Sequence, residues 1–263
     1  MEEIRATSWG HLHDLLFTDS WHAQLRRHRS DFVYRGEASV DAKLATSLQR
    51  LGGDYAEVER HLLRNFRKYA HREDVPEDSL WHWLALAKHH ALATRLLDWT
   101  FSPYVALHFA TAYPHDYGKD GLIWMVDFVK TNQLLPEQLR EGLEREGMNA
   151  MSADQLLEHA PRLSAFDALG DDFVVFFEPP ALDQRIVNQY ALFSLMPSPH
   201  ARMDEWLESR PGLARRIVIP AELKWEVRDK LDQANITERV LFPGLDGLAI
   251  WLKRYFSPRV TAG

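Results

Sequence analysis

Residues 88–110 read KHHALATRLLDWTFSPYVALHFA, and this stretch decides the fold because it joins two expected helices through a polar connection. Its apolar residues, from Leu92 to Phe109, imply that much of the stretch is buried. A second helix is expected from Ser102, because the proline that follows is tolerated in a first helical turn. Charged side chains among so many leucines must be paired or face a site, since an unpaired buried charge is costly. We therefore expect residues 94–100 to form a functional loop, with a purely structural pair of Arg95 and Asp98 as the alternative.

Outward from this stretch, the spacing of apolar residues predicts helices and strands along the whole chain. Helices are expected over residues 8–27, 54–71, 79–90, 102–112, 221–233 and 247–255. Strands are expected over residues 32–34, 121–128, 173–177, 191–196 and 216–219. The run 173–177 is apolar throughout, which is typical of a central strand. Because helices and strands are mixed without strict alternation, we predict an α+β fold with a central mixed or antiparallel sheet and flanking helices. Residues 1–263 should form one domain, with an N-terminal helix within residues 1–28 and a peripheral helical insertion at 130–170.

Composition and charge exclude several classes of function. The 263 residues contain no cysteine, which excludes a disulfide framework, a thiolate zinc site and a cysteine nucleophile, and fits a reducing compartment. The start of the chain shows no signal peptide, and no apolar run approaches the roughly 20 residues that span a bilayer. We expect a cytoplasmic protein without a membrane partner. The net charge of −7 disfavours non-specific binding to nucleic acid, and the basic stretch 60–72 is interpreted as a solvated helix face.

Two further segments carry polar groups suited to a ligand. Arg35 follows Tyr34 at the end of an expected strand, and its rigid fork of donors suits a carboxylate or a phosphate. Gly36, beside it, would let the backbone approach a ligand closely. Arg185 and Gln189 are four residues apart, so they share one face of a helical turn. The ordinary alternatives are a surface salt bridge for Arg35 and a plain polar helix for the later pair.

Together these segments resemble the FRG domain family over roughly residues 30–255. The matching motifs are YRG at 34–36, the Leu-x-x-Ser-Leu-x-Arg-like stretch at 44–50, TRLLDWT at 94–100 with the helix that follows, Arg-Ile, Gln and Phe within 185–193, and LFPGLDGLA at 241–249. The chain departs from the family pattern at 88–93, where Gln-His-Tyr-Gly-Leu-Pro is usual, and at Ala191, where glycine is typical. Members of this family are mostly microbial or viral, so the resemblance implies a role in phage defence or as a toxin.

A weaker similarity of layout links the chain to ADP-ribosyltransferases. These enzymes place Arg or His on a first strand, a polar segment before a helix, and Glu or Gln on a later strand. The layout implies NAD as a substrate, bound as a nucleotide-type small molecule, with an acceptor that is either protein or nucleic acid. It implies stacking on nicotinamide by Trp99 or Tyr34, and negative charge from Asp98 or Glu178. The catalytic candidates are then Arg35, His89, Asp98 and Gln189. The candidates for binding NAD are Tyr34, Gly36, Thr94, Arg95, Trp99, Thr100 and Arg185.

Two other functions stay open at this point. One is a non-catalytic module that captures a nucleotide or a peptide in the same pocket. The other is a metal-dependent hydrolase, for which the candidate ligands are His82, His89, His90, His108 and Asp98. The HExxH pattern is absent and the histidine spacing fits ordinary helix decoration, so we expect no metal site.

Overall fold

The computed structural model describes residues 1–70, 78–170, 172–181 and 183–259. Within them, a seven-stranded sheet has the order β1-β9-β6-β4-β5-β8-β7. The strands are β1 (Glu2–Arg5), β4 (Phe32–Glu37), β5 (Leu97–Thr100), β6 (Gly121–Asp127), β7 (Val175–Phe177), β8 (Ala191–Leu195) and β9 (Ala214–Ile219). β1 runs parallel to β9 and all other neighbours are antiparallel, so the sheet is mixed. The predicted α+β class with a mixed central sheet is confirmed.

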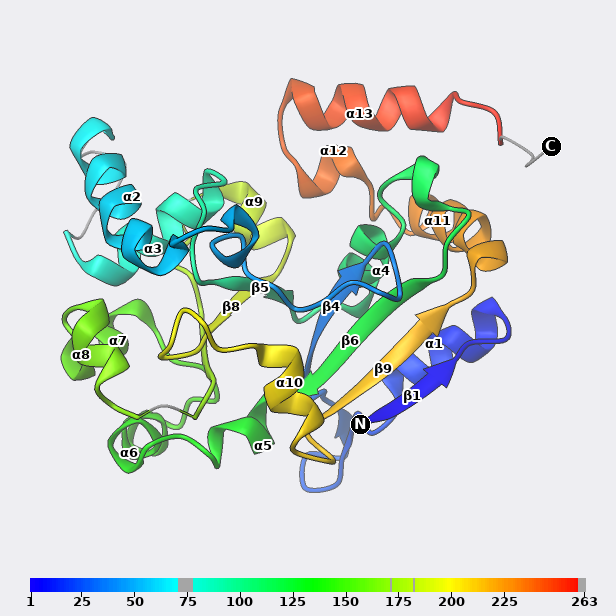
Figure 1. Ribbon diagram of the computed structural model, residues 1–263. Helices are drawn as coiled ribbons and strands as arrows, with labels where there is room; N and C mark the ends of the chain where they lie inside the picture. The colour runs from blue at the N-terminus through cyan, green and yellow to red at the C-terminus, as the bar shows by residue number, and fades with distance from the viewer. Residues whose placement is uncertain (71–77, 171, 182, 260–263) are drawn as a thin grey trace.

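Helices flank this sheet, as Figure 1 shows. They are α1 (Trp9–Phe17), α2 (Tyr55–Tyr69), α3 (Leu80–His89), α4 (Pro103–Ala110), α5 (Phe128–Asn132), α6 (Glu137–Glu146), α7 (Ala153–His159), α8 (Leu163–Asp167), α9 (Gln184–Asn188), α10 (Met203–Glu208), α11 (Lys224–Gln233), α12 (Glu238–Leu241) and α13 (Leu245–Tyr255). Two begin where the sequence predicts, because the hydroxyls of Ser79 and Ser102 accept backbone N–H groups of the first turns of α3 and α4. The end of α2 predicted at residue 71 lies outside the described residues. Within the described residues, no helix has the length and apolar character needed to cross a bilayer.

The sheet consists of two halves that meet at one pair of residues. β4 is registered with β6 along its whole length, and β5 likewise with β8. Between β4 and β5, in the described part of the chain, the register holds a single pair, Tyr34 opposite Thr100. One half of the sheet therefore consists of β1, β9, β6 and β4, and the other half consists of β5, β8 and β7. Beyond this pair, the facing edges of β4 and β5 are not paired with each other in the described part of the chain.

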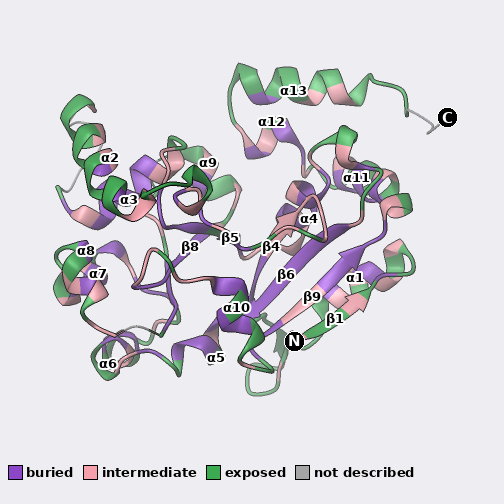
Figure 2. Ribbon diagram, in the orientation of Figure 1, coloured by how far each residue is buried: buried purple, intermediate pink, exposed green. Residues whose placement is uncertain are grey.

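Helix α4 packs on β4 by direct backbone contact. A Cβ atom added to Gly36 would lie 1.8 Å from the carbonyl oxygen of Ala106 and 2.8 Å from the backbone nitrogen of Ala110. Small residues on the helix and glycine on the strand thus allow this close approach. In Figure 2 β6 and much of β4 and α4 are coloured as buried, whereas β1 at the edge of the sheet is largely exposed. The packing of α4 therefore fixes Arg35, the neighbour of Gly36.

The predicted N-terminal helix within residues 1–28 is wrong in extent. α1 ends at Phe17, Asp19 adopts a left-handed φ of 59°, and a short hairpin follows, formed by β2 (Trp21–His22) and β3 (Arg27–His28). β1 precedes the helix and pairs with β9, so its partner lies more than 200 residues away in sequence. Local spacing cannot reveal a strand that is created by so distant a partner.

Two further expectations are corrected by the sheet order. Residues 175–177 form the edge strand β7 rather than a central strand. They are buried because helices cover them: Phe177 packs with Trp81 of α3 and Phe166 of α8 in one core cluster. Residues 97–100 form strand β5, where a loop was expected. The segment 130–170 is helical, as predicted, and its apolar side chains build that same core cluster.

Candidate functional site

A cavity of about 440 Å³ lies beside the place where β4 and β5 stop pairing. It is lined by β4, the end of α3, β5 and α9. Nine of the residues singled out in the sequence line it: Tyr34, Arg35, Gly36, His89, Asp98, Trp99, Thr100, Arg185 and Gln189. The structure therefore brings three distant segments of the chain together around one space.

Asp98 is the anionic centre of this cavity. Its carboxylate oxygen Oδ2 lies 2.7 Å from Nζ of Lys88 and 3.7 Å from Nη1 of Arg35. Burial raises the pKa of the Asp98 carboxyl, but the positive charges of Lys88 and then Arg35 outweigh burial and leave the pKa below its ordinary value. The side chain is 55% exposed, so it faces the open space. Asp98 thus offers a fixed negative charge to a ligand at neutral pH.

Arg35 is held by two acceptors that set the plane of its guanidinium. Its Nε donates to Oε1 of Glu37 at 2.6 Å, and its Nη1 donates to the backbone oxygen of Asp98 at 2.8 Å. The second bond spans the gap between β4 and β5. In the described chain no acceptor lies within hydrogen-bond distance of Nη2. A guanidinium fixed on one side and open on the other can bind an anion at little cost in side-chain entropy.

His89 joins α3 to α9 at the wall of the cavity. Its Nε2 lies 2.5 Å from Oδ2 of Asp183, whose Oδ1 accepts the backbone N–H of Ile186 and caps α9. Burial lowers the pKa of His89, and the charge of Arg185 adds to this effect, while Asp183 opposes it. The ring is therefore neutral at pH 7. If Nε2 carries the proton that Asp183 accepts, Nδ1 holds the lone pair and can act as a base.

Arg185 and Gln189 reach the cavity because α9 is docked on both of its sides. The backbone oxygen of Gln189 accepts the hydroxyl of Thr100 at 2.7 Å, and its Nε2 donates to the oxygen of Leu241 at 3.0 Å. Arg185 lies over the ring of Phe242, 4.9 Å from the centroid. Among the described residues, no carboxylate lies within 4 Å of its guanidinium. Gln189 is positioned by β5 and α12, whereas Arg185 keeps its charge available.

Tyr34 and Trp99 line the cavity but are almost fully buried, at 1% and 3% exposed. The Tyr34 hydroxyl donates to the oxygen of Leu16 at 3.0 Å, and Nε1 of Trp99 donates to Oγ of Ser194 at 2.8 Å. Neighbouring side chains on a strand point to opposite faces. The exposed Asp98 lies on one face of β5, and Trp99 therefore points into the core on the other. The polar atoms of both rings are thus already engaged within the protein, and the stacking expected of them stays a prediction. Tyr113, which follows α4 and is exposed, also lines the cavity.

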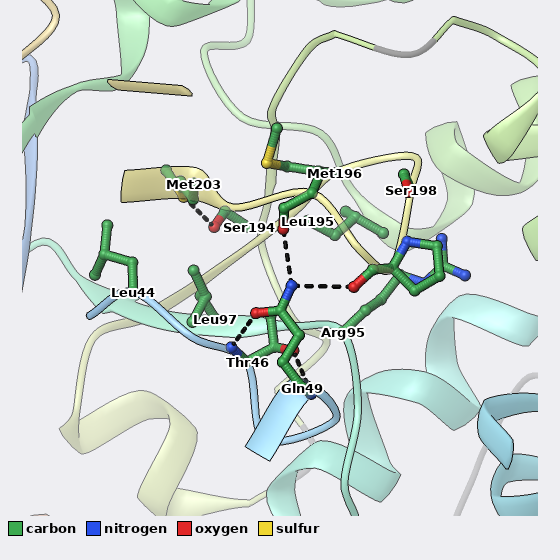
Figure 3. A pocket seen from close by; sticks show the side chains of 12 residues that line it. Leu44, Thr46, Gln49, Arg95, Leu97, Ser194, Leu195, Met196, Ser198 and Met203 are labelled. Atoms are coloured by element: carbon green, nitrogen blue, oxygen red, sulfur yellow. Dashed lines mark hydrogen bonds between the residues drawn. The ribbon is translucent and has the colours of Figure 1, made fainter. Parts of the chain in front are cut away.

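Thr94 and Arg95 lie away from the cavity. Arg95 donates to Glu59 of α2 at 2.5 Å and to Asp167 of α8 at 2.6 Å, so the alternative pair of Arg95 with Asp98 does not form. The backbone N–H of Thr94 donates to Oγ of Ser47 at 3.0 Å. Figure 3 shows Arg95 in a small pocket beside Gln49. The volume of this pocket, about 10 Å³, is that of about one water molecule. These residues support the fold around the cavity.

Among the lining residues for which the sequence predicted no role in the site are Glu37, Arg50, Lys88 and Tyr113. A signal existed for Glu37, because it lies two residues after Arg35 on a strand and therefore shares its face. Lys88 stood in the stretch that departs from the family pattern, but no local rule pairs it with Asp98 ten residues later. Glu178, the other expected source of negative charge, does not line the cavity. Its backbone N–H donates to the oxygen of Met151, in another part of the fold.

Ala91, beside the cavity, adopts a left-handed φ of 60°, at a position where the family usually has glycine. A left-handed conformation costs an L-residue about 1–2 kcal/mol, more than the entropy that glycine adds to the unfolded chain. We expect Ala91→Gly to raise the free energy of unfolding by about 0.5–1 kcal/mol, measured by urea denaturation. Ala93→Gly is the matched control, since Ala93 has an ordinary φ, and it should lower stability by a similar amount. Equal effects of the two substitutions would contradict the assignment of strain to Ala91.

The histidines and acids proposed as metal ligands have other partners. Nδ1 of His82 lies 2.6 Å from the hydroxyl of Ser79, and Nδ1 of His108 accepts from Arg228 at 2.9 Å. Within residues 1–70, 78–170, 172–181 and 183–259, no group of three or more His, Cys, Asp or Glu side chains is arranged to hold a metal ion.

Comparison with known proteins gives one match. No curated protein and no solved structure matches the chain. The family model of the FRG domain matches residues 30–119, which comprise β4, α2, α3, β5 and α4. This match contains Arg35, His89 and Asp98, and the motifs around Arg185 and at 241–249 lie outside it. The resemblance drawn from the motifs is therefore confirmed for this segment. The similarity to the FRG domain thus covers residues 30–119.

Proposed function

We propose that the cavity binds a nucleotide through its phosphates, and that NAD is the nucleotide. The observation that carries this proposal is the charge of the lining. Four cationic side chains, Arg35, Arg50, Lys88 and Arg185, outnumber the two carboxylates of Glu37 and Asp98. The chain as a whole has a net charge of −7, so the positive charge is local. A positive cavity with low-dielectric walls concentrates anions, and arginine forks suit phosphate oxygens.

Each part of NAD has a counterpart in the lining. Nη2 of Arg35 would donate to a phosphate oxygen, with Arg185 supplying further positive charge. Oε1 of Gln189 would accept a ribose hydroxyl, because Nε2 already donates to Leu241. The exposed ring of Tyr113 would stack on a base. The volume of about 440 Å³ falls in the range of small-molecule sites, about 300–1,000 Å³.

The same groups support cleavage of NAD at the bond between nicotinamide and ribose. This bond breaks with its electron pair leaving on nicotinamide, so positive charge develops on the ribose carbon C1′. The ionised carboxylate of Asp98 would stabilise that charge. An oxygen nucleophile, from water or an acceptor, would form the new bond to C1′ and give its proton to Nδ1 of His89. Arg35 would hold the phosphates through the reaction.

NAD binding is tested by calorimetry with two matched arginine variants. Arg35→Ala should weaken NAD binding at least tenfold, because it removes a preorganised fork. Arg215→Ala should leave the affinity unchanged: the Arg215 side chain is 19% exposed against 15% for Arg35, and is also ion-paired, to Asp19, but it lies away from the cavity. Arg35→Lys, which keeps the charge without the fork, gives an intermediate affinity if the geometry matters. Absence of NAD binding by the wild type, or equal binding by Arg35→Ala, would contradict the proposal.

A non-catalytic binding module is the second candidate, favoured by the ion pair between Lys88 and Asp98 at 2.7 Å. That pair reduces the negative charge Asp98 can offer to a developing cation. Nicotinamide release, followed by chromatography, separates the two candidates. Release by the wild type supports the enzyme, whereas binding without release supports the module. Lys88→Gln would free Asp98, so release by this variant alone would show that the ion pair suppresses turnover.

A further inference from the structure

A second cavity, of about 540 Å³, lies between α2 and α8 and shares no lining residue with the first. Figure 1 places both helices at the same end of the molecule. The cavity is lined by an unusual number of arginines: Arg60, Arg64 and Arg67 from α2, Arg162 from the turn before α8, and Arg95 at the base. We name this site the arginine groove.

The acidic groups at the base of the arginine groove are already paired. Arg95 donates from Nε and Nη2 to Glu59, with the shortest contact at 2.5 Å, and from Nη1 to Asp167 at 2.6 Å. Burial opposes the charge of Arg95, but these two carboxylates raise its pKa above the ordinary value. Glu59 and Asp167 are therefore engaged by Arg95, which is the cation nearest to them. Asp167 also interacts electrostatically with Arg60, and Glu57 is a further lining carboxylate, so five arginines face three carboxylates in this groove.

The rim arginines form an exposed ladder. Arg60, Arg64 and Arg67 are spaced by four and three residues, so they share one face of α2 and rise along it by about 6 and 4.5 Å. Arg67 pairs with Asp78 at 2.8 Å, and its guanidinium stacks over Trp83. For Arg60, Arg64 and Arg162, no acceptor lies within hydrogen-bond or ion-pair distance in the part of the chain that the structure describes. Arginines in excess of carboxylates around one cavity repel one another, and a bound anion would lower that repulsion.

We propose that the arginine groove binds a small polyphosphate anion, at a site separate from the nucleotide cavity. The forks of Arg60 and Arg64 would hold successive phosphoryl groups, and Arg162 would close on them from the opposite side. The hydroxyl of Ser164 adds a donor to this lining. The groove contains no aromatic side chain among its described lining residues. A single strand of nucleic acid usually stacks its bases on aromatic rings, so the lining favours a phosphate chain without bases.

Titration of inorganic tripolyphosphate by calorimetry at low ionic strength tests the proposal. We expect the wild type to bind one equivalent, with an affinity that falls as salt is added. The double variant Arg60→Ala with Arg64→Ala should lose at least tenfold in affinity. Both side chains are exposed, so this variant should fold, and its melting temperature checks that it does. Arg140→Ala with Arg145→Ala is the matched control: both lie on α6, away from the groove, with side chains 42% and 61% exposed, and this variant should bind as the wild type does.

Four results would overturn the proposal. The first is no tripolyphosphate binding by the wild type, and the second is equal binding by the α2 double variant. The third is loss of binding in Arg35→Ala, which would place the anion in the nucleotide cavity. A short single-stranded DNA that binds where tripolyphosphate does not would also count against it. NAD affinity is measured on the same proteins, so failure of the NAD proposal is distinguished from failure of this one.

Discussion

Gly36→Ala is expected to destabilise the protein by about 3 kcal/mol, the upper end of the usual range for overpacking. The added Cβ atom would lie 1.8 Å from the backbone oxygen of Ala106 and 2.8 Å from the backbone nitrogen of Ala110. Backbone atoms cannot rotate away as a flexible side chain does, so all of α4 would have to move off β4. The loss of unfolding free energy is measured by urea denaturation, monitored by circular dichroism at about 222 nm, near the helical minimum.

Gly118→Ala is the control for this experiment. A Cβ atom there meets no other atom within 4 Å, so the free energy of unfolding should change by less than about 0.5 kcal/mol. Movement of α4 would also displace Arg35, so surviving Gly36→Ala protein should bind NAD more weakly. If Gly36→Ala unfolds at the same urea concentration as Gly118→Ala, the close approach of helix and strand is not what requires glycine at position 36.

Acidification is expected to remove stability through His108, the second large effect. His108 is 1% exposed, and its Nδ1 accepts a hydrogen bond from Nη1 of Arg228 at 2.9 Å. Burial, followed by the charge of Arg228, lowers the pKa of His108 to about 3. Protonation would replace the acceptor by an N–H that faces another N–H, and would bury a second positive charge. The folded state therefore keeps this ring neutral.

The sign of the pH dependence follows from the two pKa values. In the unfolded chain His108 takes up its proton near its ordinary pKa of about 6.5, whereas in the folded chain it does so near 3. Between these values the unfolded state binds more protons, so stability falls as pH falls. We expect a loss of roughly 2–3 kcal/mol from this residue between pH 7 and pH 4.5.

Urea denaturation at several pH values isolates the contribution of His108. His108→Gln keeps an acceptor for Arg228 and does not titrate, so its stability should depend less steeply on pH in this window. His115→Gln is the control, because the His115 side chain is 76% exposed, and it should keep the slope of the wild type. Carboxylates titrate alike in all three proteins and cancel in the comparison. Identical slopes for the wild type and His108→Gln would refute the assignment.

Elements with strong local signals were predictable from the sequence. The caps at Ser79 and Ser102 place the starts of α3 and α4, because each hydroxyl satisfies a free N–H of its own first turn. The spacing of apolar residues along α2 and the apolar run of β6 likewise report local burial. The sheet order was not predictable. β1 has no strong pattern of its own and exists because β9 offers it an edge.

The residues of the candidate site were likewise only partly predictable from the sequence. The motifs contain Arg35, Asp98 and Gln189, and the structure confirms that all three line one cavity. The partners of the motif residues came from elsewhere: Lys88 reaches Asp98, and Asp183 reaches His89. Arg95 stands in the same motif as Asp98, yet its guanidinium lies in the core with Glu59. A motif shows that residues are needed together, but it does not distinguish those that face a ligand from those that support the fold.

By itself, the sequence determined the class of fold, most helices and strands, and the set of polar residues from which the cavity is built. These follow from interactions between residues a few positions apart, which spacing and capping make visible. The tertiary structure alone decided the single register pair between Tyr34 and Thr100, and with it the gap in which the cavity lies. It also decided which face of β5 meets the cavity, and hence that the Asp98 side chain is exposed there while Trp99 is buried in the core. These features depend on packing between segments that are distant in sequence. The neighbours of each side chain there cannot be predicted from the residues next to it in the chain.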